Sequence, residues 1–370
     1  MTVRYVGIGG NDANDGLSWA NRKLTLNGAE NTPVEAGDTV YVGPGTYREL
    51  LTCDVSGGAG AAISYIGDYD GTHTTGVKGI VRVTGSDDDL TATRASCITA
   101  TSKNLRTFRG FAFGMTTGNV VSATTSATWI IEQCMFIDFL ARINAVQVSG
   151  ASQAAVTVRN CAFVYPGSSG VYFQHSADVS DAGHVVENCL IIGARDRCIG
   201  FENVGGATVR NCAFLAIQGS GVQITAALAA GQSVAVNNCI FARLGGTALA
   251  AAAVGEIVED YNTLSDVVTA RANTNAGANS LTTPPLFDAR WFFEAVNGGN
   301  MVTPFDLSSA SKLIDVAGTS PTTTDMRGTA VQGAQREWGA LEYNSALLLA
   351  TLLAVAGAVF FRAPIASWCH

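Results

Sequence analysis

Short stretches of alternating apolar and polar residues follow one another along most of the chain, and one pattern recurs among them. Its copies are Phe108–Phe113, Ile131–Phe136, Val158–Phe163, Val186–Ile191, Val209–Phe214 and Val236–Phe241, with a degenerate copy at Val258–Thr263. From Phe111 through the cysteines to Tyr261, the copies are separated by 23, 27, 28, 23, 27 and 22 residues. A repeat of this length with strand periodicity and no helical periodicity predicts a solenoid of short strands.

The alternation changes phase at one position in each copy. Val158 and Asn160 share one parity, whereas Cys161 and Phe163 share the other. Because apolar residues must face inward on both sides of the change, the chain bends there, and asparagine suits a bend because it tolerates left-handed backbone geometry. We expect an internal asparagine ladder and a column of inward thiols that pack as small apolar groups. These residues are Asn160, Asn188, Asn211 and Asn238, and Cys134, Cys161, Cys189, Cys212 and Cys239.

A second strand recurs in step with the first, at 146–148, 171–173, 199–201 and 222–224. Each follows a Gly/Ser-rich corner such as 166–170. Two or three short strands per repeat are typical of a parallel β-helix, and the LxxLxL frame of leucine-rich repeats is missing. The sequence therefore predicts an all-β, single-stranded parallel β-helix.

The chain resembles the right-handed parallel β-helix, or pectin-lyase-like, superfamily over about residues 3–343. Tyr5–Trp19 resembles its leading segment, Ala36–Tyr47 its first turn, and Ser311–Gly318 and Arg336–Tyr343 its closing segment. The resemblance implies an N-terminal segment and cap over 1–35, with a short helix within 17–35, and a β-helix with its closing segment over 36–343. The superfamily includes pectate lyases, glycosidases, epimerases, phage tailspikes and adhesin-like proteins, so the resemblance is specific for fold and not for activity.

The composition of the chain argues against several classes of protein. With 47% hydrophobic and 14% charged residues, the 370-residue chain is not intrinsically disordered. Its net charge is −8 and its Lys and Arg form no cluster, which argues against nucleic-acid binding. Met1 leads into fold-like sequence without the features of a secretion signal, so we expect the nine cysteines to be reduced. None has a partner at zinc-ligand spacing, and we expect no cofactor.

The outward positions of the second strand predict a polar face with little charge. They form two rows, Gln147, Tyr172, Gly200 and Gln223, and Ser149, Gln174, Glu202 and Thr225. Glycosidases use two carboxylates about 5–9.5 Å apart, and this face carries one. The acids that remain as catalytic candidates for a hydrolase or lyase are Asp178, Asp181, Asp196 and Glu202, and none is convincing; we expect the first three to be solvated loop charges.

Other side chains are candidates for binding. Tyr172, His175, Gln147 and Gln223 are candidates for contact with a glycan, while His175 and His184 are expected to be surface histidines without partners. Trp129 has the inward parity of Ile131 and is expected in the core. Asp12 and Asp15 are candidate calcium ligands, although a plain turn accounts for them equally well.

The composition changes abruptly after Tyr343. Ala346–Phe361 contains one hydroxyl and no charge, and as a helix it would be about 24 Å long, short of the roughly 30 Å core of a bilayer. A helix that is apolar on all sides must be buried. For the tail, 344–370, we expect an apolar helix that drives oligomerisation or docks into an assembly, with membrane contact through 346–361 as the alternative.

These features favour a structural and attachment protein of a bacteriophage virion, of tailspike, fibre or head-spike type. The resemblance implies a homotrimer, with other virion proteins and a host-surface glycan as partners, assembled in the host cytoplasm. Two alternatives stay open. One is a polysaccharide lyase or glycoside hydrolase, and the other is a membrane-anchored bacterial surface protein.

Overall fold

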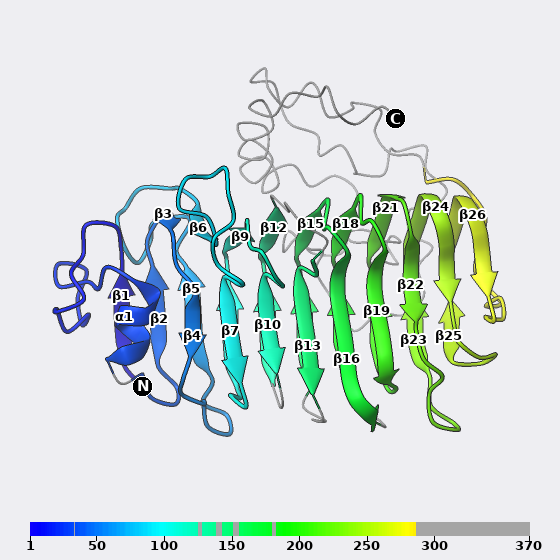
Figure 1. Cartoon of the computed structure of the whole chain (residues 1–370), viewed down its shortest axis with the longest axis horizontal. Coiled ribbons are helices and arrows are strands. Elements are labelled where there is room, and N and C mark those ends of the chain that lie inside the picture. The colour runs from blue at the N-terminus through cyan, green and yellow to red at the C-terminus, as the bar shows by residue number, and fades with distance from the viewer. Residues whose placement is uncertain (33, 125–127, 138–142, 151–154, 180–182, 286–370) are drawn as a thin grey trace, which may run out of the picture.

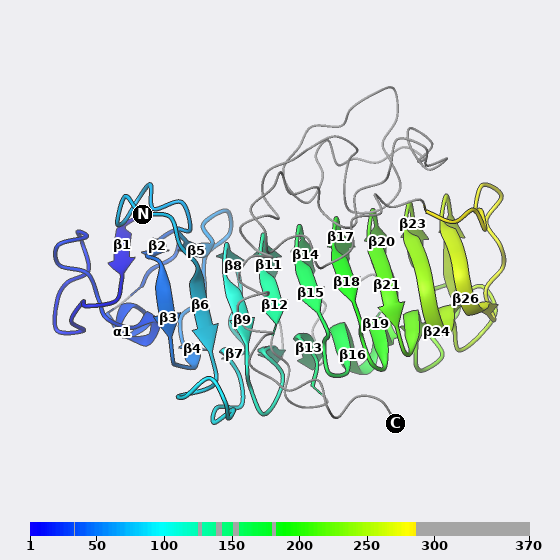
Figure 2. The same ribbon diagram turned by 90° about the horizontal axis from the view of Figure 1, so that it is seen from above.

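The protein is a parallel β-helix, as the repeat predicts (Figure 1). The computed structural model describes residues 1–32, 34–124, 128–137, 143–150, 155–179 and 183–285. Successive turns stack along one axis, and each turn contributes short strands to up to three flat walls (Figure 2). All pairings between neighbouring turns are parallel within these ranges, which is the arrangement expected when each strand pairs with its equivalent one repeat later.

The first wall is a 10-stranded sheet, called here the first sheet. Its strands in order are β1 (Val3–Val6), β2 (Thr39–Val42), β5 (Ile63–Gly67), β8 (Arg106–Arg109), β11 (Trp129–Glu132), β14 (Val156–Arg159), β17 (Val185–Glu187), β20 (Thr208–Arg210), β23 (Val234–Asn237) and β25 (Ile257–Asp260). Because β1 pairs with β2, the N-terminal segment contributes the first strand of the solenoid as well as its cap.

The other two walls belong to a 16-stranded sheet that turns back at β24. The second row contains β3 (Gly45–Tyr47), β6 (Val81–Thr84), β9 (Ala112–Gly114), β12 (Met135–Ile137), β15 (Ala162–Val164), β18 (Leu190–Ile192), β21 (Ala213–Ile217) and β24 (Ile240–Ala250). The third row contains β4 (Leu51–Cys53), β7 (Ile98–Thr101), β10 (Val121–Thr124), β13 (Val146–Gly150), β16 (Ser169–Val179), β19 (Arg197–Val204) and β22 (Ser220–Ile224), and β26 (Thr263–Ala272) pairs with β24.

The bend between the first sheet and the second row lies at the phase change in the sequence. Its residues all have φ between 53° and 77°: Gly110, Gln133, Asn160, Asn188, Asn211, Asn238 and Tyr261. Asparagine enters this left-handed region more readily than most residues. Asn188, Asn211 and Asn238 are buried, and Asn188 Nδ2 donates to Asn160 Oδ1 at 3.1 Å. The bend is therefore an internal polar ladder.

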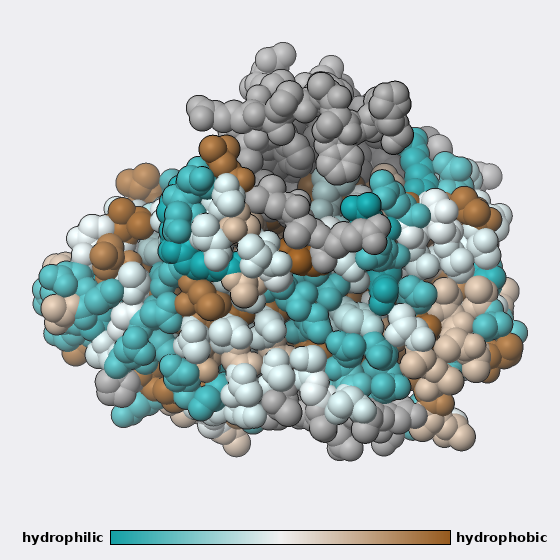
Figure 3. All heavy atoms as spheres, viewed as in Figure 1, coloured by the Kyte–Doolittle hydropathy of each residue, from teal (hydrophilic) through white to brown (hydrophobic). Residues whose placement is uncertain are grey.

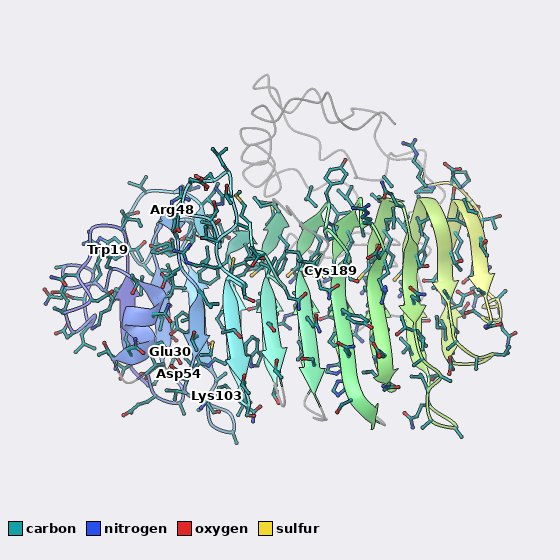
Figure 4. All side chains as sticks on the ribbon, in the orientation of Figure 1. Trp19, Glu30, Arg48, Asp54, Lys103 and Cys189 are labelled. Carbon is teal, nitrogen blue, oxygen red and sulfur yellow. The ribbon has the colours of Figure 1, made fainter. Side chains whose placement is uncertain are left out.

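Stacked apolar side chains fill the interior. Phe113, Phe136 and Phe163 stack with ring centroids 5.5 and 4.7 Å apart, and Trp129 is buried as its parity predicts. The eight cysteines that the structure describes are free and buried, and Figure 4 shows Cys189 between the walls. Burial raises the pKa of Cys189 well above its usual value, so this thiol stays protonated.

A short helix covers the N-terminal end of the solenoid, within the predicted range 17–35. Helix α1 (Leu26–Asn31) begins at Thr25, whose side chain accepts a hydrogen bond from Gly28 N at 2.8 Å. Glu30 of α1 points into the solenoid, where its carboxylate pairs with the Arg106 guanidinium at 2.5 Å (Figure 4). Both side chains are fully buried, so the cap is held by a charge pair inside the core.

Several predictions concern residues beyond this part of the chain. The closing segments 311–318 and 336–343, the tail 344–370 and its apolar helix 346–361 lie outside the described residues, and the boundary at 343 stays a prediction. Within the described ranges, no helix has the length and apolar character needed to cross a bilayer.

Candidate functional site

The two predicted polar rows lie on the outside of the third row in the predicted register. Gln147 pairs with Tyr172, which pairs with Gly200, and Gln223 follows. In the next row, Ser149, Gln174 and Glu202 are neighbours. Figure 3, viewed like Figure 1 with these strands in front, shows this wall as mostly hydrophilic and intermediate residues.

A chain of hydrogen bonds runs along this face from one turn to the next. Asn119 Nδ2 and Asn144 Nδ2 donate to Gln147 Oε1 at 2.6 and 2.9 Å. Gln147 Nε2 donates to Gln174 Oε1 at 3.1 Å, and Gln174 Nε2 donates to Glu202 Oε2 at 3.0 Å. The side chains are partly exposed, so each amide is held in one orientation while it still faces solvent. We call this set, with Tyr172 and Arg197, the polar strip.

An aromatic ring lies at the C-terminal part of the polar strip. The Tyr172 hydroxyl donates to Glu202 Oε2, and the Arg197 guanidinium lies 5.0 Å from the centre of the Tyr172 ring. Gly200 leaves room for them, because a Cβ atom there would come within 2.6 Å of Tyr172 Cδ2 and of Arg197 Cδ. Burial and the hydrogen bond to Glu202 raise the pKa of Tyr172, so its phenol remains a hydrogen-bond donor at neutral pH.

The candidate acids do not come together in the described structure. Glu202 accepts hydrogen bonds from an amide and a phenol, and these partners among the described residues include no second carboxylate. Asp196 lies at a corner, where its backbone N donates to Ser168 O at 3.1 Å. Asp181 lies outside the described residues, and for Asp178 the structure describes the backbone of β16 alone. Among the described side chains, this face thus offers one carboxylate where a glycosidase needs a pair.

The prediction of surface histidines is wrong. His175 and His184 have exposed fractions of 2% and 0%, and their Nε2 atoms lie 3.3 Å apart. Strand β16 continues past Gln174, so His175 takes the inward parity of Phe173, and the His184 ring stacks on Phe173 at 4.2 Å. Burial, with the neighbouring His175 second, lowers the pKa of His184 to about 3. His175 therefore has almost no surface to offer a glycan.

The two candidate calcium ligands hold turns. Asp12 Oδ1 accepts from Leu24 N and Thr25 N at 2.8 and 2.9 Å, and Asp15 Oδ1 accepts from Leu17 N at 2.9 Å. Across the described ranges, no three His, Cys, Asp or Glu side chains are grouped as metal ligands. Backbone donors hold one oxygen of each carboxylate, which favours the turn interpretation.

The first sheet carries a charge ladder that was not predicted from the sequence. Its outward residues in register are Arg109, Glu132, Arg159, Glu187, Arg210, Asn237 and Asp260. Arg159 pairs with Glu132, and Arg210 with Glu187, each at 2.6 Å. The signal was present, because the ladder residue immediately precedes the bend in every copy of the repeat. These charges neutralise one another between turns, so this wall is a poorer candidate for ligand binding than the polar strip.

Comparison with known proteins supports the fold. Residues 119–283 match a family model described as a right-handed β-helix region. A rhamnogalacturonan lyase is 16% identical, with 95% of this chain and 98% of that chain covered and a TM-score of 0.52. A pectate lyase is 15% identical, with 93% and 97% covered and a TM-score of 0.50. A lacto-N-biosidase from Eubacterium ramulus is 12% identical, with 71% and 56% covered and a TM-score of 0.50. No curated protein gives a significant match. At these identities the likeness is one of fold.

Proposed function

We propose that this protein is a glycan-binding attachment protein, and that the polar strip on β13, β16, β19 and the adjoining corners is its binding surface. One observation carries the proposal. Hydrogen-bonding groups and a partly exposed tyrosine are fixed in a line across successive turns, without a second carboxylate in the described part of the face. Oriented amides and an aromatic ring are the groups that fix a sugar in place.

The geometry of the solenoid fits a polymeric ligand. Neighbouring turns repeat every 4.7–4.9 Å or so, which is close to the length of one sugar residue in an extended polysaccharide. Gln147, Gln174 and Glu202 come from three successive turns, so each turn presents a polar side chain to one unit of such a chain. A repeating surface of this kind suits a repeating ligand.

The setting that we propose is a bacteriophage virion, where the protein acts as a homotrimeric spike or fibre bound to other virion proteins. The single carboxylate among the described side chains of the polar strip supports this role, and so does the apolar segment 346–361, which as a helix would need burial. Light scattering on the full-length chain tests the trimer, and a monomer would contradict this part of the proposal.

A polysaccharide lyase or glycoside hydrolase is the second candidate. The contact of Tyr172 with Glu202 and Arg197 favours it, because a phenol, a carboxylate and a guanidinium meet there on a fold that known polysaccharide lyases share. Against it, the raised pKa of Tyr172 keeps the phenol protonated at neutral pH, so that the phenol is not available as a base. Among the described side chains, the hydrogen-bond partners of Glu202 include no second acid.

One experiment separates the two candidates. A panel of bacterial capsular and lipopolysaccharide glycans, polygalacturonate and rhamnogalacturonan is tested for binding, for new reducing ends and for unsaturated products. We expect binding without products. Products that disappear in Glu202→Gln, but persist in the control Thr157→Ala on the first sheet, would establish the enzyme. Absence of binding to every glycan would contradict the proposal.

A further inference from the structure

One outer wall of the solenoid is apolar over six neighbouring strands. The outward residues of β9, β12, β15, β18, β21 and the start of β24, from Ala112 to Ala242, form a hydrophobic cluster separate from the core. We call them the apolar strip. Phe136 and Phe163 of the same strands point into the core, so Met135 and Ala162 beside them point outward.

This wall differs from the other two. The first sheet carries its charge ladder and the third row its polar strip. The apolar strip instead carries large apolar side chains, among them Met135 on β12, Leu190 on β18 and Leu215 on β21. The exposed fraction of each residue of the strip is 7% or less. Among the described residues, the partly buried apolar side chains that pack against it are Ile80 and Tyr261. An apolar surface of this extent is covered in a soluble protein.

The chain leaves the solenoid at the end of this strip. Thr263 and Ser265 follow Ile240 and Ala242 in register, and they replace the apolar side chains with hydroxyls. Thr263 Oγ1 donates to Thr283 O at 2.6 Å. The last described residues therefore run beside the C-terminal end of the strip, and residues 286–370 follow from that point.

The length of the strip matches one segment of those residues. The strip crosses six neighbouring strands, and the five spacings between them, at about 4.7–4.9 Å each, add up to about 24 Å. As a helix, Ala346–Phe361 is also about 24 Å long, and it has no charge. The 60 residues of 286–345 are long enough to bring it back along the solenoid.

We propose that Ala346–Phe361 packs as a helix along the apolar strip of its own chain. Apolar side chains then meet apolar side chains over the whole strip, which removes both surfaces from water. Because the helix is apolar on all sides, its opposite face is left for contact with other copies or with an assembly.

Photo-crosslinking in the full-length chain tests this directly. A photoreactive amino acid replaces Leu190 in the strip, and in the control it replaces Thr157 on the first sheet. Mixing isotopically heavy and light chains separates cross-links within one chain from those between chains. We expect Leu190 to cross-link to a peptide within 346–361 of its own chain, and Thr157 to give no such product. Cross-links to 286–345 alone, to another copy, or to no peptide would overturn the proposal.

Thiol labelling gives a second measurement that does not rely on cross-linking. Ile192→Cys is placed in a Cys369→Ser background and labelled with a maleimide, with and without the tail substitutions Leu352→Asp and Val355→Asp. The maleimide reaches the thiol only when the docked segment opens. We therefore expect the labelling rate of Ile192→Cys to rise about tenfold or more when the tail carries the two aspartates. Thr208→Cys on the first sheet should label equally in both backgrounds. Equal rates at Ile192→Cys would contradict the docking.

Discussion

Replacing Glu30 with glutamine tests the charge pair that holds the cap. Glu30 and Arg106 lie at 2.5 Å with both side chains fully buried. Burial alone would raise the pKa of Glu30, but hydrogen bonds from Arg106 and Tyr65 hold that pKa below its usual value, so the pair is ionised at neutral pH. Glu30→Gln keeps the shape and leaves the Arg106 charge buried without a counter-charge.

The expected loss follows from that burial. Breaking a buried pair by removing one partner costs about 3–5 kcal/mol of unfolding free energy. The exposed pair of Arg159 with Glu132 supplies the matched control, since its arginine side chain is 39% exposed, and Glu132→Gln should cost less than about 1 kcal/mol.

Denaturant unfolding measures both variants, and a double-mutant cycle with Arg106→Gln isolates the interaction. We expect a coupling energy of about 2–3 kcal/mol between Glu30 and Arg106. Hydrogen exchange should show the loss of amide protection first in α1, β4 and β8, because a solenoid opens from its ends. A loss under about 1 kcal/mol, equal to that of the control, would refute the burial of this pair.

Three further predictions concern other parts of the solenoid. Because burial holds His184 neutral with a pKa of about 3, its stabilising effect is full above pH 6.5 or so and falls as the pH drops toward 3; urea unfolding should show a loss of about 2 kcal/mol between pH 7 and pH 5, smaller in His184→Gln. Asn211→Ala should lower the unfolding free energy by about 1–3 kcal/mol, since φ is 53° there and the side chain is buried, and an unchanged thermal midpoint would contradict the ladder. Gly200→Ala should displace Tyr172 and weaken glycan binding with little effect on far-ultraviolet circular dichroism, and equal binding would mean that the ring does not touch the ligand.

The repeat made the fold predictable to the level of single backbone angles. Asn160, Asn188, Asn211 and Asn238 were expected at bends because the parity changes beside them, and each has the left-handed φ that such a bend requires. The outward rows from Gln147 to Glu202 also follow from the alternation alone, because strand parity and register depend on local sequence.

The same parity would have placed the histidines correctly. His175 continues the inward series Val171 and Phe173. The sequence analysis instead expects a loop around Asp178, whereas β16 runs on to Val179. The charge ladder could also be predicted, because its members are the residues immediately before each bend. In contrast, the pairing of Glu30 with Arg106 joins residues 76 positions apart, and neither periodicity nor composition indicates such a contact.

The hydrogen bonds of the polar strip could also not be predicted from the sequence. Alternation places Gln147 and Gln174 side by side, but which amide donates depends on Asn119 and Asn144 at the neighbouring corners. The geometry of the corners varies from turn to turn, because successive copies of the repeat are separated by different numbers of residues, from 22 to 28.

Affinity for a bound polysaccharide tests the central claim most directly. Once the panel yields a ligand, isothermal titration compares wild type with Tyr172→Ala in the polar strip and Thr157→Ala on the first sheet. We predict that Tyr172→Ala weakens binding about tenfold or more, equivalent to 1.4 kcal/mol, while Thr157→Ala binds as wild type. Equal affinity of all three proteins would contradict the assignment of the polar strip as the glycan-binding surface.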